Sequence, residues 1–395
     1  MCYNEQRQLR RSSKRVEGGA VEVKLLDEPE EWDAWVSGHP AGNVLQAFEW
    51  GEFKSEFGWQ PLRVWACEGG AVLGGAQLLL RQLPIGKVAY APRGPLISDN
   101  DSSAWPKVLQ AIHEICRERG AFFLKIEPPL ANSKALTGRL QALGFKQADE
   151  VQPRSTLIVD LKPDLRTISA RLNIKTRYNI GLAGRKGVTV SEGTEADLLA
   201  FYRLLQETCW RRQFNIHTLE YYSRVWYHLE RKGMAQLLLA SHQGEVLAAA
   251  MLFVLGTRAY YMYGASASRG RNLKPAELLQ WEAIKWAKSV GCTEYDLWGI
   301  PDEVGQAAEA GLDEQRAPDH PEDGTLPALW GVYQFKKGFG GRVVRFAGAL
   351  DYVYSPARYW LWMTGLPYLR QVAARLRLQQ RQPQLRPRAA AAEGV

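Results

Sequence analysis

Hydrophobic positions along the chain follow two rhythms, a strand-like and a helix-like one, in an order that occurs twice. Between residues 62 and 91 three apolar runs are separated by turns at Glu68-Gly69-Gly70 and Pro84-Ile85-Gly86, which predicts three strands. A helical rhythm from Ser102 to Arg119, ended by Gly120, and the apolar run AFFLKIEP come next. The first half therefore predicts three strands, a helix and a strand.

The second half repeats this order. Strands are predicted at Gln236–Ser241, Glu245–Leu255 and Arg258–Ala265, then a helix from Pro275 to Val290 and the strand TEYDLWGI. The segment VLGGA that begins at residue 72 aligns with VLAAA that begins at residue 246. A single repeat of this length indicates a duplicated domain and not a solenoid.

Antiparallel strands that lead into a helix and a further strand resemble the GNAT acyltransferase fold. The expected fold is α/β (α+β), with two tandem GNAT-like domains facing across a cleft, where a ligand is expected. The expected boundaries are 1–19 for a basic disordered leader, 20–160 for the first domain (completed by about 345–369), 161–344 for the second domain with an acidic insertion or lid at 302–327, and 370–395 for a basic disordered tail.

The formal net charge of +8 is concentrated at the two ends of the chain. Residues 1–15 and 370–395 together carry eleven Lys and Arg against Glu5 and Glu393, so the remaining body is close to neutral. The high pI is therefore weak evidence that the folded part binds nucleic acid or membrane. Trp360 and its aromatic neighbours precede the basic tail, and they suit either a helix packed on the first domain or contact with an anionic inner-membrane surface.

Several functional classes lack their motifs. The five cysteines are isolated and the six histidines scattered, so no metal and no cofactor are expected. There is no Walker loop, no GxGxxG after a strand, no HExxH and no GxSxG. The polar N-terminus does not predict a signal peptide, and the longest apolar run, Val246–Leu255, is too short to span a bilayer. A cytoplasmic protein is expected, at most at the inner face of the membrane.

Two basic stretches are candidate anion sites. SARLNIKTRYNIGLAGRKGV, from residue 169 to 188, concentrates Lys175, Arg177, Arg185 and Lys186 on a predicted helix. Phosphates of a nucleotide or RNA would suit it, and so would plain solvent exposure. In RAYYMYGASASRGRNLKP, a strand with Tyr263 is followed by a loop with Arg269 and Arg271 before a helix N-terminus, which suits an anion or pyrophosphate, although the tyrosines equally suit strand packing.

The stretch LWGVYQFKKGFGG, residues 329–341, carries the strongest candidate for catalysis. Lys336 follows Phe335 and is surrounded by glycines that let a ligand approach the backbone closely. A lysine at a strand end in such a place suits an oxyanion that forms during a reaction. A solvated lysine before a turn is the alternative.

These stretches resemble, in order, the FemABX family of peptidoglycan-bridge aminoacyltransferases. The shared patterns are LQ…W…K near the start, K.RYNI..A..KGV, YMYGAS, YDLWGI and FK.GFGG, and the resemblance covers roughly residues 43–352. It implies transfer of an amino acid, with Gly, Ala or Ser expected, from aminoacyl-tRNA as co-substrate to the stem-peptide amine of a peptidoglycan precursor that is UDP-linked or lipid-linked. No covalent nucleophile is required, because an aminoacyl ester is already activated.

The resemblance also implies residue roles. Lys54 would contact the diphosphate of the precursor, Tyr221 and Tyr263 would line the precursor site, and Phe335 and Lys336 would form the transfer site. Two departures leave the form of the precursor open: His217 stands where one branch has a phosphate-binding Arg, and Glu127 where it has Asp.

Two alternatives belong to other classes. An acyl-CoA-dependent GNAT N-acyltransferase would need a pyrophosphate loop of the Q/R-x-x-G-x-G/A type, to which SRGRN at residues 268–272 is a poor match. A non-catalytic RNA- or membrane-binding protein would account for the basic ends but not for the Phe335-Lys336 pair.

Overall fold

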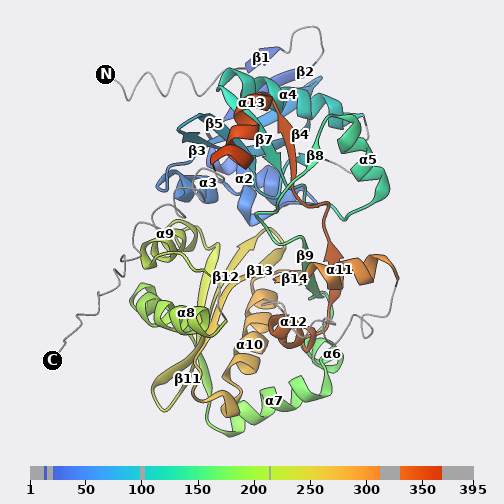
Figure 1. Cartoon of the computed structure of the whole chain (residues 1–395). Coiled ribbons are helices and arrows are strands. Elements are labelled where there is room, and N and C mark those ends of the chain that lie inside the picture. The colour runs from blue at the N-terminus through green and yellow to red at the C-terminus, as the bar shows by residue number, and fades with distance from the viewer. Residues whose placement is uncertain (1–12, 16–20, 98–102, 213–214, 312–329, 367–395) are drawn as a thin grey trace, which may run out of the picture.

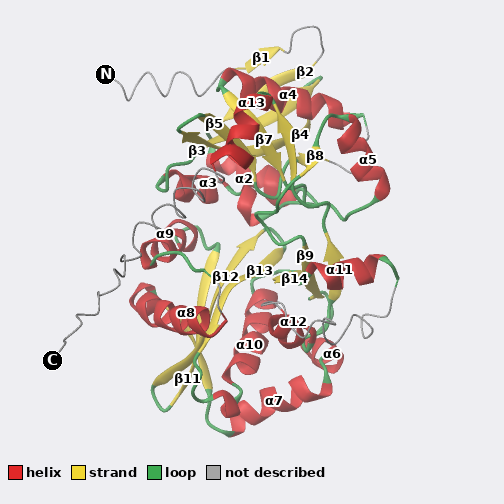
Figure 2. Ribbon diagram, in the orientation of Figure 1, coloured by secondary structure: helices red, strands yellow, loops and turns green. Residues whose placement is uncertain are grey.

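The computed structural model describes residues 13–15, 21–97, 103–212, 215–311 and 330–366. These residues form two sheets, each flanked by helices (Figures 1 and 2). The predicted tail, the predicted leader except Ser13–Arg15, and most of the acidic insertion lie outside the described residues. Ser13–Arg15 forms the short strand β1 on the edge of β2, so the prediction of a disordered leader is wrong there.

The first sheet has the order β1-β2-β3-β4-β5-β7-β16-β8, with β6 on β4. Its strands are β2 (Val21–Leu26), β3 (Gln60–Glu68), β4 (Ala71–Leu83), β5 (Gly86–Ala91), β6 (Leu96–Ile97), β7 (Ala121–Ile126), β8 (Lys146–Gln147) and β16 (Leu350–Val353). The helices around it are α2 (Pro29–Gly38), the 3-10 turn η1 (Val44–Gln46), α3 (Phe48–Ser55), α4 (Ala104–Glu118), α5 (Lys134–Ala142) and α13 (Pro356–Trp360) with the π turn η4 (Leu361–Gly365). Only β5 and β7 pair in parallel, because α4 forms the crossover between them.

The second sheet has the order β10-β11-β12-β13-β14-β9-β15. Its strands are β9 (Ser155–Asp160), β10 (Thr189–Gly193), β11 (Ala235–His242), β12 (Glu245–Leu255), β13 (Arg258–Ser266), β14 (Glu294–Ile300) and β15 (Arg342–Arg345). The helices are α6 (Leu165–Arg171), α7 (Ile174–Arg185), η2 (Glu195–Asp197), α8 (Leu198–Arg212), α9 (Leu219–Glu230), η3 (Arg271–Leu273), α10 (Pro275–Ser289), α11 (Asp302–Glu309) and α12 (Trp330–Lys337). The parallel pair β13–β14, joined through α10, matches β5–β7 of the first sheet.

Each sheet is completed by a strand that lies beyond the repeated unit in sequence. β9 follows the first unit but pairs with β14, and β16 follows the second unit but pairs with β7. The predicted boundary at residue 160 assigned β9 to the first domain, whereas β9 lies in the second sheet. The reason is that β14 would otherwise leave its outer edge unpaired, and β9 is the segment that reaches it.

The two halves share one apolar core. Phe53 of α3 packs edge-on against Tyr221 of α9 at 4.8 Å between ring centroids, and the Tyr260 hydroxyl donates to the Gly42 carbonyl at 3.2 Å. His228 of α9 contacts the Glu56 carboxylate at 2.7 Å at the edge of this core. Contacts of this kind fix the position of one half relative to the other.

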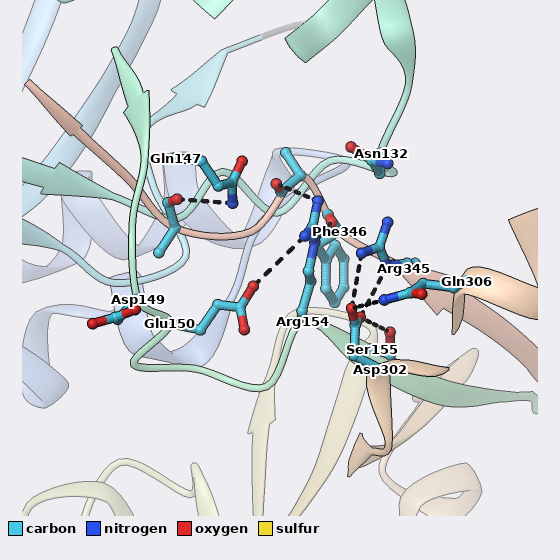
Figure 3. A network of polar contacts seen from close by, with 12 residues as sticks. Asn132, Gln147, Asp149, Glu150, Arg154, Ser155, Asp302, Gln306, Arg345 and Phe346 are labelled. Atoms are coloured by element: carbon cyan, nitrogen blue, oxygen red, sulfur yellow. Dashed lines mark hydrogen bonds and ion pairs between the residues drawn. The ribbon is translucent and has the colours of Figure 1, made fainter. Parts of the chain in front are cut away.

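A polar network ties together the two connections that cross between the halves (Figure 3). Arg154, just before β9, donates to the carbonyls of Phe346 and Ala347, each at 3.1 Å. Arg345 pairs with both carboxylate oxygens of Asp302, at 2.9 and 2.8 Å, and so holds the first turn of α11 against β15. The first residues of the predicted acidic insertion therefore form a packed helix.

Replacing Arg345 with Ala is expected to lower the free energy of unfolding by about 2 kcal/mol, because it removes charged hydrogen bonds from a largely buried guanidinium. Arg342→Ala on the same strand breaks an ion pair whose arginine is mostly exposed and should cost under about 1 kcal/mol. Urea unfolding curves of both variants at pH 7 test this difference, and equal losses would contradict it.

The Arg345 effect should also depend on pH. Burial opposes ionisation of Asp302, but hydrogen bonds from Arg345, Gln306 and Ser155 outweigh it and lower the pKa of Asp302 to about 2. A carboxyl whose pKa is lowered by folding stabilises the fold above its ordinary pKa. The gap between wild type and Arg345→Ala should therefore shrink as pH falls from about 4 towards 2.

Candidate functional site

The candidate site lies where two parallel strands separate. β13 and β14 pair only from Arg258 to Tyr260, opposite Glu294 to Asp296. Beyond that point β13 stays on β12 while β14 turns to β9, and a cavity of about 810 Å³ opens between them. Pro153 is its only lining residue from outside the second half, among the described residues, so the cavity opens within that half instead of between the halves, where the ligand site was predicted.

A β-bulge shapes one wall of the cavity. The pairing of β14 with β9 shifts register between Asp296 and Gly299, and Trp298 between them has a left-handed backbone with φ of 61°. The Asp296 carboxylate accepts the Trp298 backbone N–H at 2.8 Å and also the Thr156 hydroxyl, which holds the bulge in this conformation. Gly299, the first paired residue after the bulge, has a carbonyl that accepts a hydrogen bond from a side chain.

Lys336 is that donor. Its ammonium group lies 2.7 Å from the Gly299 carbonyl oxygen, and the residue is only 5% exposed. It lies in the last turn of α12 and not at a strand end as predicted. Trp330 and Tyr333 precede it at three-residue spacing and are buried, so Lys336 follows them onto the buried face of the helix.

Burial lowers the pKa of Lys336 to about 7, although the nearby Asp296 carboxylate raises it in part. The ammonium and amine forms therefore coexist near neutral pH. A cation kept in an apolar wall interacts strongly with any negative charge that develops in the cavity, because little water screens it.

The first half supports this wall through Arg93. Its buried guanidinium donates to the Pro153 carbonyl at 2.6 Å and lies over the rings of Trp298, at 5.4 Å, and Phe346, at 4.3 Å. A side chain from the first sheet thus packs on the residue at the centre of the bulge. Neither Arg93 nor Trp298 was singled out from the sequence.

The remaining transfer-site and loop residues are only partly brought together. Phe335, Tyr263 and Arg271 line the same cavity as Lys336. Arg269 does not: it pairs with the carboxylates of Glu245 and Glu207 on the surface. Of the two loop arginines, Arg271 therefore lines the cavity, while Arg269 forms ion pairs with Glu245 and Glu207.

Lys54 and Tyr221 form a neighbouring cluster where α3 meets α9. The Lys54 ammonium lies 5.2 Å from the centre of the Tyr221 ring, and the His217 ring stacks on the Tyr221 ring at 3.7 Å between centroids. Burial, together with the charge of Arg81, lowers the pKa of Lys54 to about 8. Because His217 also lines the cavity, this cluster and the Lys336 site adjoin.

The predicted basic helix is two helices, α6 and α7, and its cations are exposed. Lys175, Arg177, Arg185 and Lys186 all face solvent, around Tyr178, which is 60% exposed. α7 contacts residues near the cavity: Asn173 at its start donates its backbone N–H to the carbonyl of Gly338, two residues after Lys336, and the Lys186 ammonium at its end contacts the carbonyl of Asn272, which lines the cavity, at 3.2 Å.

The carboxylates near the site are already engaged. Glu127 accepts the backbone N–H groups of Val151 and Gln152, at 2.8 and 2.9 Å, and the hydroxyl of Tyr90. Its role in this geometry is to hold the connection between the halves. Asp296, which supports this candidate site, was not singled out from the sequence; the available signal was an acidic residue between the apolar Tyr295 and Leu297 in the strand TEYDLWGI. Within the described residues no cluster of His, Cys, Asp and Glu could hold a metal ion.

Comparisons with known proteins cover both halves. Residues 28–141 match the model of the FemAB family, and residues 171–307 match the model of an acetyltransferase (GNAT) domain. Lipid II:glycine glycyltransferase of Staphylococcus saprophyticus subsp. saprophyticus is 26% identical over 401 residues, which cover 83% of this chain and 92% of that protein. The enzyme of the same name from Staphylococcus haemolyticus is 24% identical, over 84% and 93% of the two chains.

Two solved structures share the architecture. The crystal structure of FemX superposes with a TM-score of 0.74 at 23% identity, over 85% of this chain and 98% of that one. A tandem GNAT protein from the clavulanic acid biosynthesis pathway gives a TM-score of 0.52 at 12% identity, over 85% and 99%. The predicted fold class, two tandem GNAT-like halves, is confirmed. None of the helices in the described ranges is long and apolar enough to cross a bilayer.

Replacing Lys336 with Met is expected to stabilise the fold by roughly 1–4 kcal/mol at pH 6, because it removes a desolvated cation from an apolar wall. Folding lowers the pKa of Lys336, so the wild type gains stability as pH rises from about 7 towards 10.5. The advantage of the variant should shrink over the same range. Urea unfolding at pH 6 and pH 9 measures it, with Lys337→Met as control; a variant less stable than wild type at pH 6 would contradict the burial of this charge.

Proposed function

We propose that the chain is an acyl-transferring enzyme of the FemABX family and that it transfers an amino acid from aminoacyl-tRNA to the stem-peptide amine of a lipid-linked peptidoglycan precursor. The observation that carries the proposal is the buried ammonium group of Lys336 in the wall of the cavity. Glycine, alanine and serine are the amino acids expected.

The reaction requires that the protein position the ester and the amine and supply one cation for the oxyanion. The amine nitrogen attacks the ester carbonyl, a C–N bond forms, and the carbonyl electron pair moves onto oxygen. Lys336 donates to this oxyanion through N–H groups that Gly299 does not occupy. When the carbonyl re-forms, the bond to the ribose oxygen breaks and that oxygen takes the proton lost by the amine.

The magnitudes fit a site without a covalent nucleophile. Holding the ester and the amine together supplies roughly 7–11 kcal/mol through effective concentration. One oxyanion donor adds about 3 kcal/mol. A lysine whose pKa is about 7 remains partly protonated at the pH where part of the acceptor amine is neutral, so both reacting forms coexist near neutrality.

Each substrate has a route to the cavity. The exposed cations of α7, whose end contacts Asn272 in the cavity lining, suit an RNA backbone whose aminoacylated end enters between Arg271 and Lys336. Lys54 and His217 suit the diphosphate of the precursor at the adjoining cluster. A lipid-linked acceptor is favoured over a UDP-linked one because both glycyltransferase relatives are named for lipid II.

Transfer from acyl-CoA is the second candidate, since a GNAT fold would bind acyl-CoA in the same cavity, where β13 and β14 separate. The loop before α10 argues against it, because Arg269, one of its two arginines, is paired with Glu245 and Glu207 and so does not face a pyrophosphate. No cofactor is therefore proposed.

Incubation of the protein with glycyl-, alanyl- or seryl-tRNA and a lipid-linked precursor should add the mass of one or more of these residues to the stem peptide. Lys336→Met should lower the rate about a hundredfold or more, since it removes an oxyanion donor. Lys337→Met in the same turn of α12 should leave the rate near wild type.

Mass spectrometry of the stem peptide reads the product directly. Acetyl-CoA in place of charged tRNA should yield no product. Acylation from acetyl-CoA, or a Lys336→Met variant as active as wild type, would contradict the proposed reaction or the role of this lysine.

A further inference from the structure

Two apolar side chains of α13 and the turn after it point to solvent and do not pack on the first sheet. Trp360 is 62% exposed and Met363, one turn further, is 38% exposed. On the opposite side of the same turns, Tyr359 and Trp362 pack on the small apolar cluster of Val88, Phe122 and Phe123. The helix is therefore held firmly from beneath and presents a tryptophan and a methionine outward.

The inner contacts make this presentation rigid. The Tyr359 hydroxyl donates to the Asp351 carboxylate at 2.9 Å, and its ring packs edge-on against Phe123 at 5.3 Å. In Figure 1 α13 lies over β5 and β7 of the first sheet. The outward residues thus have a fixed direction relative to the sheet.

Two cations lie on the side of the sheet that α13 covers. Arg358 lies against Gly86 in the β4–β5 turn, and Arg81, which pairs with Val88, lies over the Trp59 ring at 5.3 Å from its centre. Among the described residues no acidic side chain lies within ion-pair distance of these two cations, so their charge is available to an anionic partner.

This face is continuous with the Lys54 cluster. The Trp59 backbone N–H bonds to the Lys54 carbonyl at 3.3 Å, and the charge of Arg81 contributes to the lowered pKa of Lys54. A diphosphate held at Lys54 would therefore place what is attached to its far side close to Arg81 and Trp59. If that group is a lipid, it must emerge towards a bilayer.

We propose that Trp360, Met363, Arg81 and Arg358, the docking face, bind the surface of an anionic bilayer, so that the acceptor is used with its lipid still in the membrane. The role in acceptor delivery rests on the proposed function; the binding of the bilayer does not. Tryptophan at the headgroup level with arginine and lysine beside it is the composition of peripheral membrane-binding surfaces.

Charge complementarity selects this partner over a second copy of the chain. Two copies joined through this face would bring four cations together, which is unfavourable. An anionic bilayer instead neutralises them, and each cation near such a surface strengthens binding about fivefold.

Sedimentation of the full-length chain with vesicles tests the proposal. It should bind vesicles of phosphatidylcholine mixed with phosphatidylglycerol and bind phosphatidylcholine alone much more weakly. The double variant Trp360→Ser/Met363→Ser should bind about tenfold more weakly or worse. Arg81→Gln/Arg358→Gln should lose about 25-fold and show less dependence on salt.

Val290→Ser, which removes an apolar side chain that is 49% exposed on the second half, is the matched control and should bind as wild type. Circular dichroism of every variant checks folding. Wild-type binding by the Trp360→Ser/Met363→Ser variant, or no binding of vesicles by the full chain, would overturn the proposal. So would a dimer in light scattering that this variant converts to a monomer.

A second readout separates this proposal from the proposed function. With a water-soluble, short-chain precursor, Trp360→Ser/Met363→Ser should transfer the amino acid at the wild-type rate, and with precursor embedded in vesicles it should be at least about tenfold slower. Equal rates on the embedded precursor would overturn the role in delivery. Absence of transfer by the wild type would refute the proposed function and leave the vesicle result standing.

Discussion

The hydrogen bond from the Lys336 ammonium to the Gly299 carbonyl is the interaction on which the site depends. The accepting carbonyl directly follows the bulge at Trp298 in β14, and Lys336 lies with Trp330 and Tyr333 on the buried face of α12. Neither element alone would hold a cation there. A cation buried in this way is expected to cost stability, which agrees with the chemical role proposed for Lys336.

The exchange of strands between the halves explains why the site is rigid. β9 closes the second sheet and pairs with the strand that carries the bulge, while Arg93 from the first half packs on Trp298 and holds the Pro153 carbonyl. The cavity therefore lies in one half but is supported by both. A single GNAT-like half would leave β14 with an open edge and the bulge without its packing partner.

Sequence patterns were sufficient for the repeated part of the fold. Alternating apolar runs and glycine-marked turns located β3 to β5 and β11 to β13, because hairpins are local and their turn residues are visible in the chain. The positions of β9 and β16 in their sheets depend on contacts between residues far apart in sequence, so the boundary at residue 160 separated β9 from its true sheet. The FemABX resemblance, and not the local patterns, led to the expected function, and a FemAB family model matches residues 28–141.

In the candidate site, too, the residue types were visible in the sequence, but their neighbours in space were not. Lys336 and Phe335 were visible as a lysine and an aromatic residue among glycines, yet the pattern suggested a strand end, because glycines on both sides hid the three-residue spacing of Trp330, Tyr333 and Lys336. Arg269 and Arg271 looked equivalent in the sequence. Their neighbours in the structure distinguish them: Arg269 pairs with Glu245 and Glu207, whereas Arg271 lines the cavity.

The most direct measurement is an NMR titration of the Lys336 side chain in the free protein and with a phosphonate analogue of the tetrahedral intermediate bound. A buried cation that serves an oxyanion should titrate near pH 7 in the free protein and shift towards its ordinary pKa of 10.5 when the anionic analogue fills the cavity. Titration of the free protein near 10.5, with no change on binding, would contradict the account.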